Sequence, residues 1–393
     1  MAQSATRPNG RRRPARKNKI KMFSVRAGID LPFLFLVLII QTIGLIMLFS
    51  SSYAYALANE NNSFHYVGRQ LIWAIGGVAV MLMVSFFDYH KLQNVRLVMI
   101  VLLISYVLLA VVLLTDTHST AHRWIYLPGG FTFQPSELMK FTIILTFAYF
   151  MTRYYYNMHK FVSGVLPYAG IAMVTAGFLI LQPHLSCTMI IMALTGVMLL
   201  VGGVRLRWIL GAAALVAIGL YVVLYTDIIP YAGERVAVWK DPFGYPNANA
   251  SHQTRQSLYA IGSGGLLGLG LGNSRQKYLY LPEPQNDFIF AVVCEELGLV
   301  GATIIIGLYC ALVWRGMTIA KRAQDRFGAL LATGLTAQVG IQTFLNIAVV
   351  TSLFPNTGIS LPFFSYGGTS LVMLLAEMGL VLSVSRNARM DKA

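Results

Sequence analysis

Charged residues are scarce in this chain. They make up 11% of its 393 residues, and the 15 Asp and Glu are outnumbered by 30 Lys and Arg. Hydrophobic residues make up 56%, and the mean hydropathy is +0.63. A composition this apolar and this poor in charge excludes an ordinary soluble domain and indicates an integral membrane protein.

Cysteine is scarce as well, and no internal repeat is visible. Cys187, Cys294 and Cys310 lie in apolar surroundings without paired spacing, which excludes a disulfide framework or a metal knuckle. His118 and His122 are four residues apart in a short loop with no third ligand in evidence, so we expect no zinc site there. The lack of a repeat between the two halves argues against a transporter built from repeats.

Long apolar runs dominate what is present. Runs of about 17 to 25 residues predict an all-α integral membrane protein with about ten transmembrane helices. The fourth run is the weakest, because its strictly apolar stretch is short. In chain order the predicted spans are 31–49, 67–87, 97–114, 136–154, 162–181, 185–201, 208–225, 288–314, 327–354 and 367–384.

The distribution of basic residues predicts the topology. With the N-terminus inside, most of the 30 Lys and Arg fall on the cytoplasmic side, and an even number of spans places both termini there. We expect the basic tail, residues 1–26, to be disordered and to orient the first span and contact anionic lipid, without binding nucleic acid. The first span is expected to be an uncleaved signal anchor. Residues 27–393 then form one polytopic membrane domain.

One long connection, residues 227–286, is predicted to lie outside the cell. Loops of this length tend to carry function, and this one contains Arg235 and Arg255. Its glycine-rich run, 262–272, lacks the βαβ context of a nucleotide-binding motif. We interpret the run as tight turns or as backbone donors near a phosphate.

A single acid stands where this loop becomes the eighth span. Asp287 follows a polar segment with Lys277 and Glu283 and precedes a hydrophobic helix. A lone carboxylate at such a boundary is a candidate catalytic base.

Two further polar clusters are predicted at the outer ends of spans. The first contains Arg123, Glu137 and Lys140, the last two on one helical face, where a structural ion pair is the alternative to a binding site. The second, residues 355–370, contains Ser365 and Tyr366 among prolines and glycines that break helices. Such a segment is tolerated at membrane depth where it lines a cavity, so we expect a re-entrant or broken element before the last helix.

Other polar residues at membrane depth have two interpretations. Gln338, Gln342 and Asn346 share one helical face and are expected mainly to join helices. Glu296 and Glu377 are either interior hydrogen-bond partners or site residues. His184 is interpreted as a hydrogen-bonding turn residue in preference to a proton relay.

Together these clusters resemble the SEDS family of bacterial cell-wall proteins, which includes FtsW, RodA and SpoVE. The resemblance spans residues 30–386 and rests on segments 123–140, 277–298 and 361–370, in the expected order. Segment 361–368 and the basic tail resemble the division (FtsW) and sporulation branch more than the elongation branch. The sequence departs from the family pattern at His184 and Ser186, where Asp and Gly are common, and at Asn286, where Thr is frequent.

The resemblance implies a peptidoglycan glycosyltransferase that polymerises lipid II during cell division, with inversion to a β-1,4 bond and release of undecaprenyl pyrophosphate. Asp287 is the expected base. The expected substrate-binding residues are Arg123, Glu137, Lys140, Arg235, Arg255, Lys277, Glu283, Ser365 and Tyr366. Alternatives are a flippase of the same precursor and a noncatalytic division scaffold.

The resemblance also implies the protein's surroundings. We expect a multi-pass protein of the bacterial plasma membrane with its site outside. The expected partners are lipid II and undecaprenyl lipids, a class B penicillin-binding protein that crosslinks the glycan, and other membrane proteins of the division complex. Mg²⁺ or Mn²⁺ is the candidate cofactor, although no multi-carboxylate cage is visible, and no organic cofactor is expected.

Overall fold

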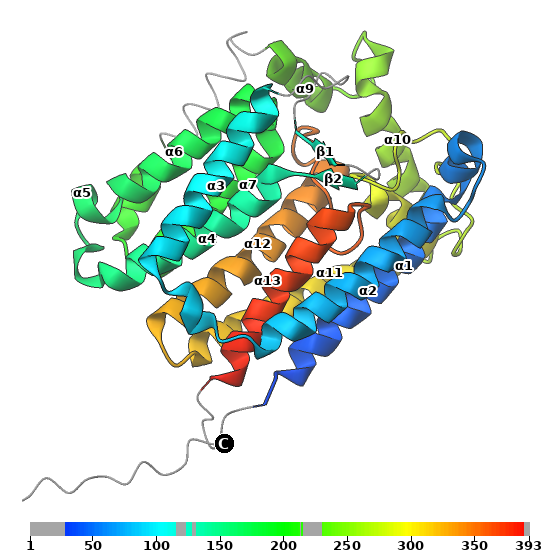
Figure 1. Cartoon of the computed structure of the whole chain (residues 1–393). Helices are drawn as coiled ribbons and strands as arrows, with labels where there is room; N and C mark the ends of the chain where they lie inside the picture. Colours follow the sequence, from blue (N-terminus) through cyan, green and yellow to red (C-terminus); the bar gives the residue numbers. More distant parts are fainter. Residues whose placement is uncertain (1–27, 115–122, 128–130, 213, 215–229, 389–393) are drawn as a thin grey trace, which may run out of the picture.

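The structure, a computed structural model, describes residues 28–114, 123–127, 131–212, 214 and 230–388. The predicted basic tail, the His118 and His122 pair and most of the seventh predicted span lie outside the described residues. Figure 1 shows the arrangement of the described helices and strands.

Helices dominate the described part of the chain, with one short hairpin. Strands β1 (Ile125–Leu127) and β2 (Phe131–Phe133) pair antiparallel, with Tyr126 opposite Thr132. The helices are α1 (Leu31–Glu60), α2 (His65–Phe86), η1 (Tyr89–Leu92), α3 (Val95–Leu114), α4 (Pro135–Arg153), η2 (Tyr155–Asn157), α5 (Phe161–Gly164), α6 (Leu166–Leu181), α7 (Leu185–Val201), α9 (Pro230–Lys240), α10 (Ala248–Gly264), α11 (Ile289–Arg322), α12 (Arg326–Val350) and α13 (Gly368–Arg386).

The all-α membrane fold is confirmed. Every predicted span except the seventh coincides with a described helix, including the weak fourth, which is α4. By length and composition, 6 of the described helices are able to cross a membrane: α1, α2, α3, α11, α12 and α13. Helices α6 and α7 are apolar but shorter.

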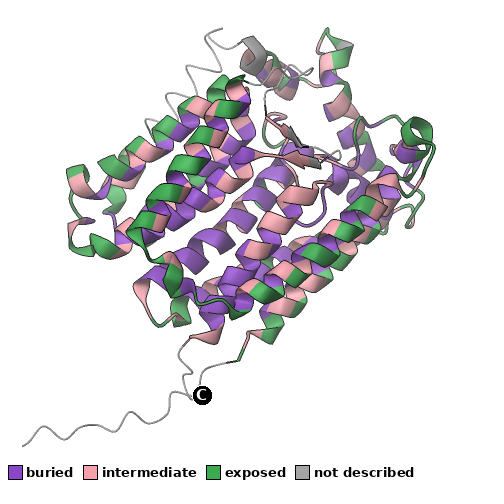
Figure 2. Cartoon of the chain, viewed as in Figure 1, coloured by how far each residue is buried: buried purple, intermediate pink, exposed green. Residues whose placement is uncertain are grey.

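Helices α12 and α13 form the interior of the bundle. Their apolar stretches are 72% and 61% buried, against 22% and 28% for α2 and α3, whose outer faces are exposed apolar surface (Figure 2). This burial explains the amides of α12 and the single carboxyl group of α13, because a polar side chain in the interior finds a partner that lipid would not supply.

The two described chain ends lie together at one end of the bundle, and the hairpin, α9 and α10 lie at the other (Figure 1). Asp30 caps α1 and accepts hydrogen bonds from Arg315 of α11 at 2.8 and 2.9 Å. The backbone N–H of Asp30 donates to Ser385 Oγ near the end of α13. This arrangement agrees with an even number of spans.

The eighth predicted span is not one continuous helix. The span predicted over 288–314 coincides with α11, which by length and composition is able to cross a membrane, but Gly298, with a φ of 66° and a ψ of −168°, interrupts its helix. The glycine-rich run closes this break: the N–H groups of Leu269 and Gly270 donate to the carbonyls of Glu295 and Glu296 at 2.9 and 3.0 Å. These donors satisfy carbonyls that a broken helix leaves without partners. Residues 262–264 end α10, and the interpretation of the run as tight turns is confirmed from residue 265 onward, where Gly265, Gly268, Gly270 and Gly272 have positive φ.

Candidate functional site

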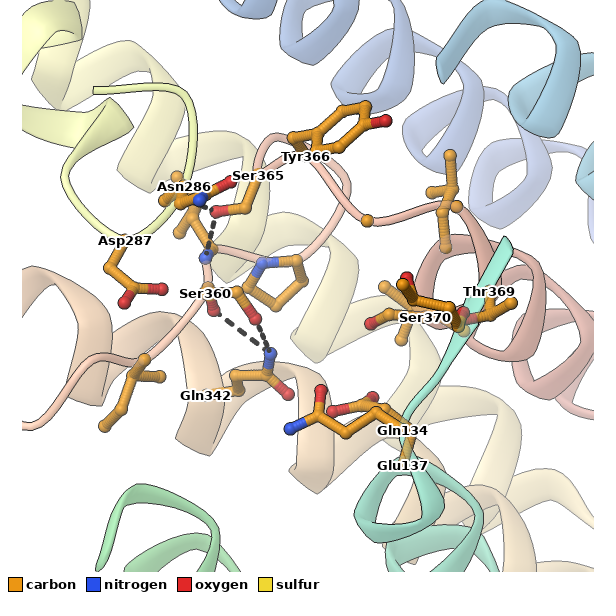
Figure 3. Close-up of a pocket in the computed structure, with 18 of the residues that line it drawn as sticks. Gln134, Glu137, Asn286, Asp287, Gln342, Ser360, Ser365, Tyr366, Thr369 and Ser370 are labelled. Atoms are coloured by element: carbon orange, nitrogen blue, oxygen red, sulfur yellow. Dashed lines mark hydrogen bonds between the residues drawn. The ribbon is translucent and has the colours of Figure 1, made fainter. Parts of the chain in front are cut away.

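A pocket of about 830 Å³ opens at the end of the bundle that carries the hairpin. The first turn of α4, the α6–α7 turn, the segment before α11, the middle of α12 and residues 358–371 line it, together with part of α2. In Figure 3, Gln342 lies between Asp287 and Glu137. The three polar clusters predicted from sequence therefore meet in one cavity.

The segment before the last helix is irregular, as predicted, and is held in place by its own side chains. Ser365 Oγ accepts from the N–H of Leu361 and donates to the carbonyl of Asn286, both at 2.7 Å. The N–H of Tyr366 donates to the carbonyl of Gln285 at 2.9 Å. Ser365 and Tyr366 thus join the re-entrant segment directly to the residues that precede Asp287 (Figure 3).

Asp287 is fixed by its neighbours along and across the chain. Asn346 of α12 donates to the Asp287 carbonyl at 2.8 Å. Gly358 has a φ of 66°, and a Cβ at that position would come within 2.9 Å of Asp287 Oδ2. A glycine is therefore needed at 358 both for its backbone conformation and for the space that the carboxylate occupies.

The environment of Asp287 raises its basicity. The pKa of the carboxyl is raised from 3.8 to about 6, chiefly by burial and also by the charge of Glu283, although the charges of Arg123 and Arg235 lower it. A carboxylate whose pKa lies near physiological pH is suited to accept a proton during a reaction.

Lys140 of α4 links Glu137 to Gln342 of α12. Its Nζ is 2.9 Å from Glu137 Oε1 and donates to Gln342 Oε1 at the same distance. Gln342 Nε2 in turn donates to the carbonyl and the hydroxyl of Ser360 at 3.0 and 3.1 Å (Figure 3). The lysine is 1% exposed, so its charge is placed by this network and scarcely screened by water.

Two arginines complete the charged surroundings. Arg123 lines the pocket and donates to the carbonyl of Pro183 in the α6–α7 turn. Arg235 of α9 donates to the carbonyl of Asn356 and acts electrostatically on Asp287. Asp287 thereby shares the pocket with Arg123 and Lys140, as proton removal and phosphate binding require, whereas Arg235 acts on Asp287 without lining the pocket.

Known proteins are similar to this chain over nearly its whole length. The family model described as cell cycle protein, FtsW/RodA/SpoVE, matches residues 30–390. The chain belongs to the FtsW/RodA/SpoVE family. It is 39% identical to the stage V sporulation protein E of Bacillus subtilis over 94% of this chain and 100% of that protein. It is 37% identical to a probable peptidoglycan glycosyltransferase FtsW of Trichlorobacter lovleyi, over 93% and 95% of the two chains.

Solved structures of the family share the fold. A chain of a peptidoglycan synthase complex described for its coordination of polymerization and crosslinking superposes with a TM-score of 0.75 at 28% identity, covering 92% of this chain and 99% of that one. The RodA of Thermus thermophilus gives a TM-score of 0.64 at 26% identity, over 92% and 98% of the chains. The family resemblance found in the sequence is confirmed.

The structure brings most predicted site residues together but not all of them. Arg123, Glu137, Lys140, Glu283, Asp287, Ser365 and Tyr366 line the pocket. Arg255 does not: it donates to Ser251 Oγ at 2.8 Å and to the carbonyl of Tyr245 within the outer loop. Lys277 does not line it either. The ammonium of Lys277 lies 3.0 Å from the Glu296 carboxylate and 2.6 Å from the carbonyl of Gly272, and the residue is 2% exposed.

The remaining polar residues at membrane depth mostly join elements. Glu296 accepts from Ser50 of α1 at 2.7 Å as well as from Lys277. Glu377 accepts from Gln338 at 2.9 Å, so these two join α13 to α12. Gln342 differs from the other amides because it also lines the pocket. The interpretation of Glu296, Glu377 and Gln338 as interior hydrogen-bond partners therefore agrees with their contacts.

Several pocket residues were not among the predicted site residues. Arg69 and Trp73 of α2, His184, and Thr369 and Ser370 at the start of α13 line the cavity. The family motifs gave no reason to include α2, whose helix is mostly lipid-facing. The sequence signals for His184 were its departure from the family pattern and its position in the turn between two predicted spans. The prediction of His184 as a hydrogen-bonding turn residue is not supported for its side chain, because Nδ1 has no partner.

The donor set fits a divalent cation only in a limited way. Among the described residues, no group of three or more His, Cys, Asp or Glu side chains is arranged to hold a metal. Asp287 and Glu283 line the same pocket and interact electrostatically. Mg²⁺ commonly binds through one or two carboxylates together with substrate phosphates, so these two residues would be its ligands on the protein.

Proposed function

We propose that this chain is a peptidoglycan glycosyltransferase that polymerises lipid II into glycan strands outside the plasma membrane. The observation that carries the proposal is the shared pocket of Asp287, Arg123 and Lys140, in which a carboxylate of raised pKa faces fixed cations. The naming of several relatives as probable peptidoglycan glycosyltransferases supports it.

The pocket suits a substrate that is part lipid and part polar. Its polar interior continues to Ile72 on α2, whose side chain is 72% exposed on the apolar surface of the bundle. A lipid-linked saccharide can therefore place its saccharide and pyrophosphate in the pocket while its chain remains in the bilayer. A soluble sugar donor would have no use for this apolar end.

The reaction needs one proton transfer and one charge to be stabilised. The 4-hydroxyl of the acceptor sugar attacks the anomeric carbon of the donor, the bond from that carbon to the phosphate oxygen breaks, and undecaprenyl pyrophosphate leaves. Asp287 accepts the hydroxyl proton, and a positioned base contributes about 10²- to 10⁴-fold in rate. Attack from the face opposite the α-linked leaving group gives the β-1,4 product.

The cations act on the leaving group. Lys140 and Arg123 lie where negative charge develops on the departing pyrophosphate, and Arg235 adds positive charge on the Asp287 side. Donors fixed before the reaction stabilise developing charge without reorganising. A bound Mg²⁺ or Mn²⁺, held by Asp287 and Glu283, would add neutralisation of the pyrophosphate.

The same proposal includes a partner and a cellular role. Because a related chain was solved within a peptidoglycan synthase complex that polymerises and crosslinks, we place this chain beside a class B penicillin-binding protein in the division complex, with other division proteins. We also propose that both termini lie in the cytoplasm.

The test is polymerisation by the purified chain with such a partner and labelled lipid II. Wild-type protein is expected to make glycan polymer that is resolved on a gel, and Asp287→Asn, which keeps the shape but loses the basicity, is expected to make none. Near-normal polymer from folded Asp287→Asn would contradict the role of the base. A flippase would instead move lipid II across vesicles without polymer, and a scaffold would tolerate the change.

A further inference from the structure

His184 is a titratable pocket residue whose chemistry the proposed reaction leaves unused. It occupies the N-cap position of α7, is 7% exposed and lines the pocket. Its side chain makes no cap hydrogen bond to α7. The turn that carries it is anchored, because Ser186 Oγ donates to the carbonyl of Thr357 in the re-entrant segment.

Two polar atoms on either side of this turn lack partners within the described residues. His184 Nδ1 is enclosed without a hydrogen bond, and so is Arg123 Nε. The same arginine donates through Nη2 to the carbonyl of Pro183, the neighbour of His184. Buried polar groups without partners are rare in folded proteins, and an orphaned N–H donor is rarer than an acceptor with unused capacity.

Electrostatics determine the protonation of this imidazole. Burial, together with the positive charges of Arg123 and Lys140, lowers the pKa of His184 from 6.5 to about 3. The ring is therefore neutral at physiological pH and has one N–H donor and one acceptor nitrogen.

The hydrogen-bond accounting indicates which nitrogen carries the proton. An enclosed N–H without an acceptor is rarer than an acceptor with unused capacity, and a lone pair is favoured in the positive field of Arg123 and Lys140. Nδ1 is enclosed and unpartnered, so we assign it the lone pair and Nε2 the proton. Since His184 lines the pocket and Nε2, unlike Nδ1, is not among the enclosed atoms without a partner, the Nε2–H is the donor that a ligand in the pocket can reach.

We propose that His184 Nε2 donates a hydrogen bond to a phosphate oxygen of the lipid-linked substrate, next to Arg123 and Lys140. This inference rests on the proposed function for the identity of the substrate. A phosphate oxygen is the acceptor that the adjacent cations attract, whereas a sugar hydroxyl gains less from them. A neutral donor adds a directed hydrogen bond without a third positive charge that would retain the pyrophosphate product.

The test compares two substitutions of equal length. His184→Gln places an amide N–H near the position of Nε2, and His184→Met fills the same space without a donor. We expect His184→Met to weaken the affinity for undecaprenyl pyrophosphate, a lipid without the saccharide, by about 10- to 100-fold, the value of a hydrogen bond to a charged group. We expect His184→Gln to bind at least about fivefold more tightly than His184→Met.

His184→Asn provides the matched control, because its amide reaches only the position of Nδ1. It is expected to behave like His184→Met, and comparison with Gln separates donor position from side-chain volume even if the Met variant does not fold. Equal affinity of the Gln and Asn variants in folded, monodisperse protein would overturn the inference. So would unchanged affinity for the pyrophosphate lipid with weakened binding of lipid II, which would place the donor on the saccharide.

Polymerisation by wild-type protein separates this inference from the proposed function. If wild-type protein polymerises lipid II but all His184 variants bind the pyrophosphate lipid equally, only the His184 inference fails. If wild-type protein makes no polymer but binding depends on the Nε2 donor as described, the glycosyltransferase proposal fails and the phosphate-donor role stands.

Discussion

The ammonium of Lys140 lies 2.9 Å from the carboxylate of Glu137, one turn earlier on α4. Because the same ammonium also donates to Gln342 of α12, the pair is part of a network that reaches the re-entrant segment at Ser360. The structural ion pair that the sequence offered as an alternative is present, yet both of its members line the pocket. The pair therefore positions a cation for a ligand as well as joining elements.

The first prediction concerns that cation in the reaction. Lys140→Met and Arg235→Met should lower the polymerisation rate more than they weaken lipid II binding, because negative charge builds on the leaving oxygen only as the bond breaks. We expect a loss of about 10²- to 10³-fold in rate for Lys140→Met. Affinity, rate and flipping should be measured for the same variants in the same lipid.

A folding control is needed for this prediction, since Lys140→Met leaves Glu137 without its partner. The double variant Glu137→Gln with Lys140→Met removes both charges and should restore thermal stability but not the rate. If binding and flipping fall together while polymerisation per bound substrate is unchanged, the proposed role of these cations is wrong.

The second prediction separates Lys277 from the substrate-binding residues. Its ion pair with Glu296 is almost completely buried, and removing one member of a buried pair costs about 3 to 5 kcal/mol. Lys277→Met should therefore lower the thermal unfolding temperature strongly, and Lys277→Met with Glu296→Gln should recover part of it. A folded Lys277→Met protein with normal stability and selectively weakened lipid II binding would restore the role predicted from sequence.

Sequence reasoning located the pocket because its chemistry lies in three short segments at helix ends. Asp287, Lys140 and Ser365 could be selected from their polarity at boundaries of apolar spans, and helix periodicity placed Glu137 on the face of Lys140. Sequence reasoning could not decide which outer cations line the pocket, because Lys277 and Arg255 carry the same charge as Arg123. Only the tertiary contacts show that Lys277 pairs with a carboxylate, that Arg255 binds a hydroxyl and that Arg123 lines the pocket.

The break in α11 at Gly298 could not be predicted from the sequence either. A glycine within an apolar run is common in membrane helices, and the positive φ of Gly298 follows from its contact with the glycine-rich run about 30 residues earlier, at residues 265–270. A pairing between distant backbone segments leaves no local pattern. His184 is similar, because only the fold brings it beside Arg123.

The third prediction concerns orientation. Cysteines introduced one at a time between residues 246 and 251 should react with an impermeant thiol reagent added outside intact cells, and cysteines in the 11–21 tail should react only after permeabilisation. Replacement of the exposed Cys310 provides the background control. The opposite pattern would place the pocket on the cytoplasmic side and contradict a reaction outside the membrane.

The last prediction uses the raised pKa of Asp287 in two measurements whose signs are linked. Only the ionised carboxylate accepts a proton, so the polymerisation rate should rise with pH through about 6 and level off above it, when substrate ionisation is constant. Because the folded pKa of about 6 lies above the ordinary 3.8, ionisation of Asp287 disfavours the folded state, and this cost grows between about pH 4 and pH 6 and is full above it. Asp287→Asn, although inactive, should thus be at least as resistant to thermal unfolding as wild type at pH 8, with the difference vanishing near pH 4. A rate that is flat from pH 5 to pH 8, or an Asp287→Asn protein clearly less stable than wild type at pH 8, would show that the carboxylate is not held in the desolvated state on which its assignment as the base depends.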